Sequence, residues 1–202
     1  MLTVSQAKAR FTHVAAQVEP VAERECRART APGTNCDFKI RIEPRVDAPV
    51  NAYQTLDKTG RPVITFTVAL ISQAQNSTEI AFVLGHEAAH HIAGHMSSQQ
   101  RNTILGAVVF AGLAAATGGS AGDVQTAQDL GAMIGSRAYS KEFELEADAL
   151  GTVITYRAGY DPLVGARFFT RLPDPGDRFL GTHPPNAARM NTVEATMARI
   201  RG

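Results

Sequence analysis

The strongest constraint on this chain is the pentapeptide His86-Glu87-Ala88-Ala89-His90, which has the pattern H-E-x-x-H. It lies in a segment, Thr78 to about Gln100, that favours one continuous helix. Positions i and i+4 share a helix face, so both imidazoles can reach one metal ion. Glu87 lies beside them, where a carboxylate can take a proton from a water that the metal activates. The pentapeptide predicts a zinc hydrolase and favours a peptidase; the competing interpretation is a polar helix whose histidines face solvent.

A third ligand is needed, and the nearest histidines do not supply it. The metzincin pattern H-E-x-x-H-x-x-G-x-x-H requires Gly and His where this chain has Ala93 and Met96. His95 is one position away from that place. On one continuous helix it would lie about 180° around the axis from the midpoint of the two motif histidines. We therefore predict that His91 and His95 are polar residues on other helix faces, not ligands.

A better candidate lies downstream, in the helical pattern of Lys141–Gly151. Glu144 and Asp148 are spaced i and i+4, and two such carboxylates repel unless a cation or a donor lies between them. Glu144 would bind zinc, and Asp148 would accept the outer N–H of a ligand histidine. The alternative is an acidic solvated face, which we predict for Glu142 and Glu146. The other face carries an apolar stripe of Phe143, Ala147, Leu150 and Ile154.

These motifs, in this order, resemble the HtpX/BepA-type family of zinc metallopeptidases, gluzincins whose third ligand is a glutamate. The resemblance covers the chain from about Asn51 to its end. It implies that His86, His90 and Glu144 bind zinc and that Glu87 is the general base. The segments that carry it, besides H-E-x-x-H, are Asn51-Ala52-Tyr53, Ser136-Arg137, Glu144 to Gly151, Ala158-Gly159-Tyr160-Asp161-Pro162, and Thr182-His183-Pro184-Pro185 with Arg189.

The resemblance also brings His183 and Arg189 to the zinc cleft. His183 follows a loop-forming stretch and precedes Pro184-Pro185, which suit the start of a final helix through about Arg199. It would stabilise the oxyanion of the tetrahedral intermediate or occupy the open zinc position at rest. The alternatives are a loop residue for His183 and a surface or helix-capping residue for Arg189.

We expect an α+β fold, a mostly helical zincin-like (mini-gluzincin) domain with a small sheet beside the H-E-x-x-H helix. Strands are predicted at Phe38–Ile42 and Pro62–Val68. The resemblance implies that the strand beside the helix binds extended peptide by strand addition. We treat residues 1–202 as one domain, with an N-terminal helix and cysteine-containing segment at 1–50 and a catalytic core at 51–202. Val4, Ala7, Phe11, Val14 and Val18 form one side of the N-terminal helix.

The most apolar window, Thr103 to Thr117, carries no charge. It is 15 residues long, whereas a transmembrane helix needs about 20. We predict a buried helix packed against the zinc helix. The glycine-rich Gly118–Gly122 loop that follows is predicted to be mobile and to cover the cleft, the alternative being a plain connector.

Two cysteines, Cys26 and Cys36, flank the turn-rich segment Thr30–Asn35. A disulfide there would contribute about 3 kcal/mol in the chain-entropy model; the alternative is two buried thiols in a cytosolic protein. The first 19 residues contain no unbroken apolar stretch of a secretory signal. The protein is then either cytoplasmic, or its sequence starts after a removed signal or lipoprotein anchor. We favour the periplasm or cell envelope.

The formal net charge of +1 gives no electrostatic case for nucleic-acid binding. We expect a metalloendopeptidase with one Zn²⁺ per chain that cleaves unfolded or misassembled polypeptides in quality control of the cell envelope. Membrane association is compatible with this role, although no transmembrane segment is predicted. The alternative is a zinc-binding envelope chaperone or assembly factor with weak or latent protease activity. A zinc hydrolase of a small substrate is a further alternative, against which the elongated strand-addition groove argues.

Overall fold

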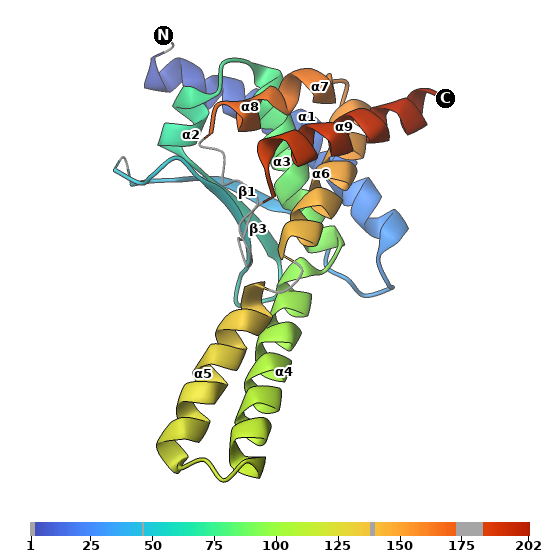
Figure 1. Cartoon of the computed structure of the whole chain (residues 1–202). Helices are drawn as coiled ribbons and strands as arrows, with labels where there is room; N and C mark the ends of the chain where they lie inside the picture. Colours follow the sequence, from blue (N-terminus) through green and yellow to red (C-terminus); the bar gives the residue numbers. More distant parts are fainter. Residues whose placement is uncertain (1–2, 46, 138–139, 173–183) are drawn as a thin grey trace.

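The computed structural model describes residues 3–45, 47–137, 140–172 and 184–202. Most of the described chain is helical, and one small sheet lies beside the helices (Figure 1), which confirms the predicted α+β class. The elements are α1 (Val4–Arg29), β1 (Lys39–Glu43), β2 (Ala52–Leu56), β3 (Pro62–Thr67), α2 (Val68–Gln73), α3 (Ser77–Ile92), α4 (His95–Ala116), α5 (Ala121–Arg137), α6 (Ser140–Arg157), α7 (Pro162–Gly165), α8 (Arg167–Thr170) and α9 (Asn186–Arg201).

The sheet has the order β1-β3-β2. β1 runs parallel to β3 with Lys39 opposite Val63, and β2 runs antiparallel to β3 with Ala52 opposite Phe66. Every residue of β3 is buried, as expected for a central strand. β2 packs beside α3. One edge of β2 pairs with β3, and within the described residues the opposite edge has no strand partner.

The amphipathic N-terminal helix is confirmed and extends to Arg29. The predicted stripe is buried except for Val4, which is 53% exposed. α1 packs along α3 and also contacts α6. Glu25, only 4% exposed, forms ion pairs with Arg29 at 2.9 Å and with Arg157 of α6. This helix therefore supports the two helices that carry the motifs.

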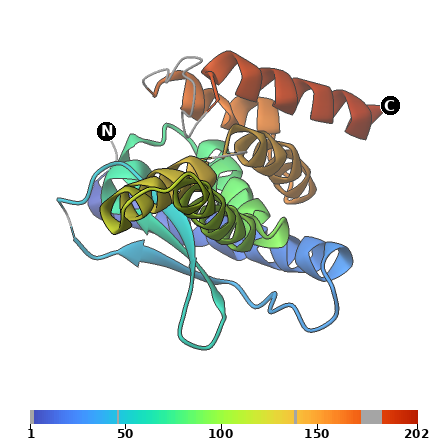
Figure 2. The same ribbon diagram turned by 60° about the horizontal axis from the view of Figure 1, so that its bottom comes forward.

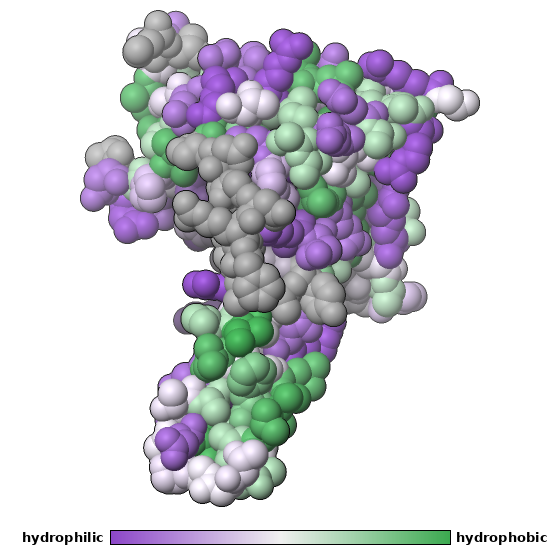
Figure 3. All heavy atoms as spheres, in the orientation of Figure 1, coloured by the Kyte–Doolittle hydropathy of each residue, from purple (hydrophilic) through white to green (hydrophobic). Residues whose placement is uncertain are grey.

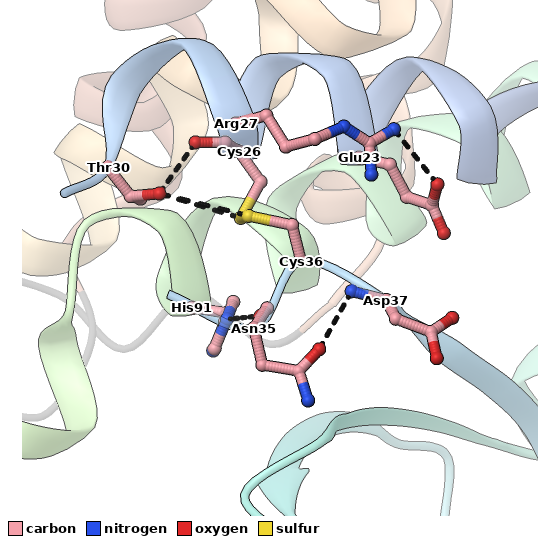
Figure 4. Close-up of a disulfide and its surroundings, with 8 residues drawn as sticks. All are labelled: Glu23, Cys26, Arg27, Thr30, Asn35, Cys36, Asp37 and His91. Carbon is pink, nitrogen blue, oxygen red and sulfur yellow. Dashed lines mark hydrogen bonds and ion pairs between the residues drawn. A yellow bond between two sulfur atoms is a disulfide. The ribbon is translucent and has the colours of Figure 1, made fainter. Parts of the chain in front are cut away.

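The predicted disulfide between Cys26 and Cys36 is confirmed (Figure 4). It joins the last turns of α1 to the segment that leads into β1. In the loop that the bond closes, the backbone oxygen of Asn35 accepts a hydrogen bond from Nε2 of His91 at 2.8 Å. The disulfide loop is thus attached to α3 as well as to α1.

The continuous helix predicted from Thr78 to about Gln100 is wrong. Asn76 caps α3 through its side-chain oxygen, which accepts from the backbone N–H of Glu79 at 3.0 Å. The helix ends at Ile92, and Gly94 adopts a left-handed backbone with φ of +69°. A glycine in this conformation ends helices without a steric penalty. A new helix, α4, then starts at His95.

The helix predicted for Thr103–Thr117 is present as far as Ala116, but its predicted burial against the zinc helix is wrong. This segment lies in α4, which pairs with α5 in a hairpin that projects from the other elements in Figure 1 and points toward the viewer in Figure 2. Leu105, Val108 and Leu113 are 61%, 64% and 64% exposed. Hydrophobic residues accordingly cover much of the visible face of the hairpin in Figure 3.

The physical reason is a contact between helix backbones. A Cβ on Gly106 would lie 2.1 Å from the backbone oxygen of Gly131, so α4 and α5 pack through glycines. Their larger apolar side chains are left outside that contact.

The Gly118–Gly122 segment forms the tip of the hairpin and lines no part of the main pocket, so the prediction that it covers the cleft is wrong too. Among the described helices, none combines the length and apolar character needed to cross a membrane.

We predict opposite effects for two glycine substitutions in α4. Gly106→Ala should separate the hairpin helices at a cost of about 1–3 kcal/mol, because the new methyl group collides with the α5 backbone. Gly112→Ala should stabilise α4 by about 0.5–1 kcal/mol, because its Cβ meets nothing within 4 Å. Amide hydrogen exchange should be faster in α4 and α5 of the first variant and slower in the second. Equal protection in both variants would contradict the glycine contact.

Candidate metal centre

The site depends on a close approach of α3 and α6. A Cβ on Gly85 would lie 2.9 Å from the backbone oxygen of Gly151, and a Cβ on Gly151 would lie 2.9 Å from the backbone nitrogen of His86. The two backbones therefore touch at the first histidine of the motif. Glu144 and Asp148 lie on α6 within two turns of this contact, which places both carboxylates opposite the histidines.

Candidate ligand atoms of three residues face one another at this contact. Nε2 of His86 lies 3.1 Å from Nε2 of His90 and 3.6 Å from Oε2 of Glu144. Nε2 of His90 lies 3.3 Å from Oε1 of Glu144. Ligands at about 2.0–2.1 Å from a tetrahedral zinc ion are separated by roughly 3.3 Å. Two imidazoles and one carboxylate are a donor set that suits zinc, so the residues fit this ion.

Asp148 lies behind His86, as expected from the sequence. Its Oδ1 is 2.9 Å from Nδ1 of His86, and the carboxylate is fully buried. A proton on Nδ1 would be donated to Asp148, which leaves Nε2 of His86 available as a ligand. The i, i+4 spacing of Glu144 and Asp148 on α6 predicts such a contact between Asp148 and a ligand histidine.

Arg189 of α9 is neither a surface residue nor a helix cap in the structure. It is 6% exposed and donates two hydrogen bonds to Asp148, from Nε at 2.7 Å and from Nη2 at 2.6 Å. Its guanidinium lies 3.4 Å from the ring centroid of Phe169. No pattern in the sequence predicts this aromatic contact. The arginine thus holds the carboxylate that in turn orients His86.

The electrostatics favour a cation. Burial opposes the charged form of Asp148, but hydrogen bonds from Arg189 and His86 outweigh it and lower the pKa of this carboxyl. Burial likewise disfavours charged His86, yet Asp148 and Glu144 raise its pKa to about 9. Burial raises the pKa of Glu87, against the opposing effect of the two motif histidines. The cluster of His86, His90 and Glu144, which attracts positive charge, therefore lies beside Glu87, whose pKa is raised.

The candidate ligands lie at a pocket of about 510 Å³. Glu87 is half-buried in its wall, and part of β2 forms another wall. An extended chain along β2 would therefore pass the three ligands. The lining residues are Val50, Asn51, Ala52, Tyr53, Gln54, Leu70, Val83, His86, Glu87, His90, His95, Met96, Gln99, Ser140, Phe143, Glu144, Phe168, Phe169, Leu172, Pro184, Asn186 and Arg189.

The prediction that His95 lies on another helix face is wrong. The helix breaks at Gly94, and Nδ1 of His95 lies 2.9 Å from Nδ1 of His90. Nε2 of His95 lies 3.1 Å from Oε2 of Glu146, whose side chain is 62% exposed. The signal in the sequence was Gly94 itself, because a glycine after a helical pattern commonly ends the helix.

The predicted site residue His183 lies outside the described residues, so its position relative to the pocket stays a prediction.

The fold and this arrangement of histidines and carboxylates define a zincin-like metallopeptidase domain. A model of peptidase family M48 matches residues 8–197, and the chain belongs to this family.

Curated relatives share this region. The chain is 31% identical over 144 residues to a beta-barrel assembly-enhancing protease of Escherichia coli O157:H7, covering 60% of this chain and 28% of the relative. It is 34% identical over 132 residues to a putative beta-barrel assembly-enhancing protease of Vibrio cholerae, covering 57% and 25%. It is 27% identical over 131 residues to the mitochondrial metalloendopeptidase OMA1 of Arabidopsis thaliana, covering 63% and 26%. The matched region is therefore about a quarter of each relative's length.

We predict that Gly151→Ala weakens zinc binding by about tenfold or more, because the new methyl group pushes α6 and its carboxylates away from His86. Zinc affinity would be measured by competition with a chromophoric chelator. Gly112→Ala, far from the pocket and with open space around its Cβ, is the matched control. An unchanged affinity in folded Gly151→Ala would show that the close approach does not position the ligands.

Proposed function

We propose that this chain is a zinc-dependent endopeptidase domain in which His86, His90 and Glu144 bind the metal and Glu87 is the general base. The observation that carries the proposal is the convergence of three ligand atoms, from two helices, within 4.8 Å of one another. Glu87 opens into the same pocket. Membership of a peptidase family supports the same reaction.

When bound, zinc polarises a carbonyl and lowers the pKa of water toward about 7. Glu87 then accepts the proton of the attacking water and delivers it to the leaving amine. Asp148 and Arg189 act behind His86 by holding its ring orientation. His183 is proposed, on its sequence motif alone, to stabilise the oxyanion.

The proposed substrate is an extended polypeptide that adds to the outer edge of β2. Support comes from the position of this strand, which lies in the pocket wall and has no partner on that edge among the described residues. Backbone hydrogen bonds to a strand edge bind many sequences, with selectivity left to side-chain pockets. Such binding suits a protease that acts on unfolded chains.

We propose cell-envelope protein quality control as the setting. Two relatives are a beta-barrel assembly-enhancing protease and a putative one, and a disulfide is typical of an oxidising compartment. We further propose that residues 1–202 work as one unit, because α1 packs on both motif helices.

A second candidate function is that of a zinc-binding chaperone or assembly factor with latent protease activity. The exposed apolar side chains of α4 favour it, because such surfaces bind other proteins.

We predict that Glu87→Gln retains zinc but lowers casein degradation by about 100-fold or more, because the base is lost while the ligands remain. Glu144→Gln should lower zinc content and activity together. The measurements are elemental analysis and casein cleavage, each with and without a chelator.

Glu142→Gln is the control on the same helix as Glu144, since Glu142 is exposed and lies outside the pocket. Full hydrolysis by Glu87→Gln would remove Glu87 as the base. Wild-type protein that binds zinc, suppresses aggregation of an unfolded client and leaves casein intact would favour the chaperone.

We predict a period-two response to N-methylation along a peptide substrate. An added strand directs alternate peptide groups toward the sheet edge, so only every second N–H pairs with β2. Each blocked pairing position should lower kcat/KM by roughly 2- to 10-fold, with little effect at the positions between. A uniform response, or none, would contradict strand addition while leaving the zinc site untouched.

A further inference from the structure

His95 has a polar environment that its sequence position did not predict. It is only 5% exposed, and its ring stacks on Phe143 with centroids 4.6 Å apart and planes 17° from parallel. Its two ring nitrogens face His90 and Glu146 at 2.9 Å and 3.1 Å. A buried imidazole with a partner on each nitrogen is held in one orientation.

The protons of this group have one consistent arrangement once His90 serves as a ligand. Nε2 of His90 faces His86 and Glu144, so its lone pair is directed to the metal and its proton must be on Nδ1. Nδ1 of His90 then donates to Nδ1 of His95. His95 must in turn carry its proton on Nε2, which donates to the carboxylate of Glu146. Each ring nitrogen of His90 and His95 then has a compatible partner.

We propose that His95, supported by Glu146, is a positioning residue that fixes the tautomer and ring orientation of His90. This inference rests on the proposed zinc site. Both motif histidines are then supported in the same way. Asp148, held by Arg189, contacts Nδ1 of His86. His95, held by Glu146, contacts Nδ1 of His90.

The geometry argues against His95 as a zinc ligand itself. Its Nδ1 contacts the nitrogen of His90 that faces away from the ligand cluster, and its Nε2 faces Glu146. Neither nitrogen belongs to the cluster formed by His86, His90 and Glu144. The left-handed Gly94 accompanies this contact, because it separates the end of α3 at Ile92 from the start of α4 at His95.

The first test is zinc affinity by chelator competition. His95→Phe keeps an aromatic ring against Phe143 but removes the acceptor, and should weaken zinc binding by about 10- to 100-fold. His95→Asn can place an amide oxygen near the lost Nδ1 and should recover part of the affinity. Glu146→Gln should have a smaller effect, because its side chain is 62% exposed. His91→Gln is the control, since His91 contacts Asn35 instead.

The second test needs no substitution. ¹⁵N NMR of histidine side chains in the zinc-loaded wild type should show His90 protonated on Nδ1 and His95 protonated on Nε2. A proton on Nδ1 of His95, or wild-type affinity in His95→Phe, would overturn the inference while the zinc site stands. Failure of the wild type to bind zinc would instead overturn the proposed function, and this inference with it.

Discussion

The candidate centre depends on one contact, the backbone approach of α3 and α6 at Gly85 and Gly151. Each motif is local: H-E-x-x-H lies on one helix, and the two carboxylates lie on another. Only a close helix pair brings the three side chains within reach of one ion, and any larger residue at the contact would separate them. α1 and its disulfide loop, which pack along the same helices, support this pair from outside.

Each of the two motif histidines contacts a polar group through Nδ1, and a second residue fixes that group in turn. Asp148 is fixed by Arg189, whose guanidinium lies on Phe169. His95 lies between His90 and Glu146. Rings held in this way lose little further freedom when an ion binds, so the site is organised in advance. The same carboxylates supply the negative charge that favours a cation.

The sequence predicted those parts of the site that follow from helical spacing. The pairing of Glu144 and Asp148 with the motif histidines, the capped start of α3 and the α+β class all follow from local patterns. His95 was misplaced because the prediction assumed a continuous helix, whereas Gly94 ends it in a left-handed turn. The α4–α5 hairpin was misplaced because low charge and high hydropathy favour burial. Contact between Gly106 and Gly131 is a tertiary feature that hydropathy does not encode.

X-ray absorption at the zinc edge of the purified wild-type protein is the most direct measurement of the central claim. We expect one zinc ion with two imidazole nitrogens and oxygen ligands at about 2.0–2.1 Å, from Glu144 and solvent. A third imidazole, from His95 or from His183, would contradict the ligand set. An oxygen-only or sulfur-containing shell, or protein without metal, would contradict the zinc centre itself.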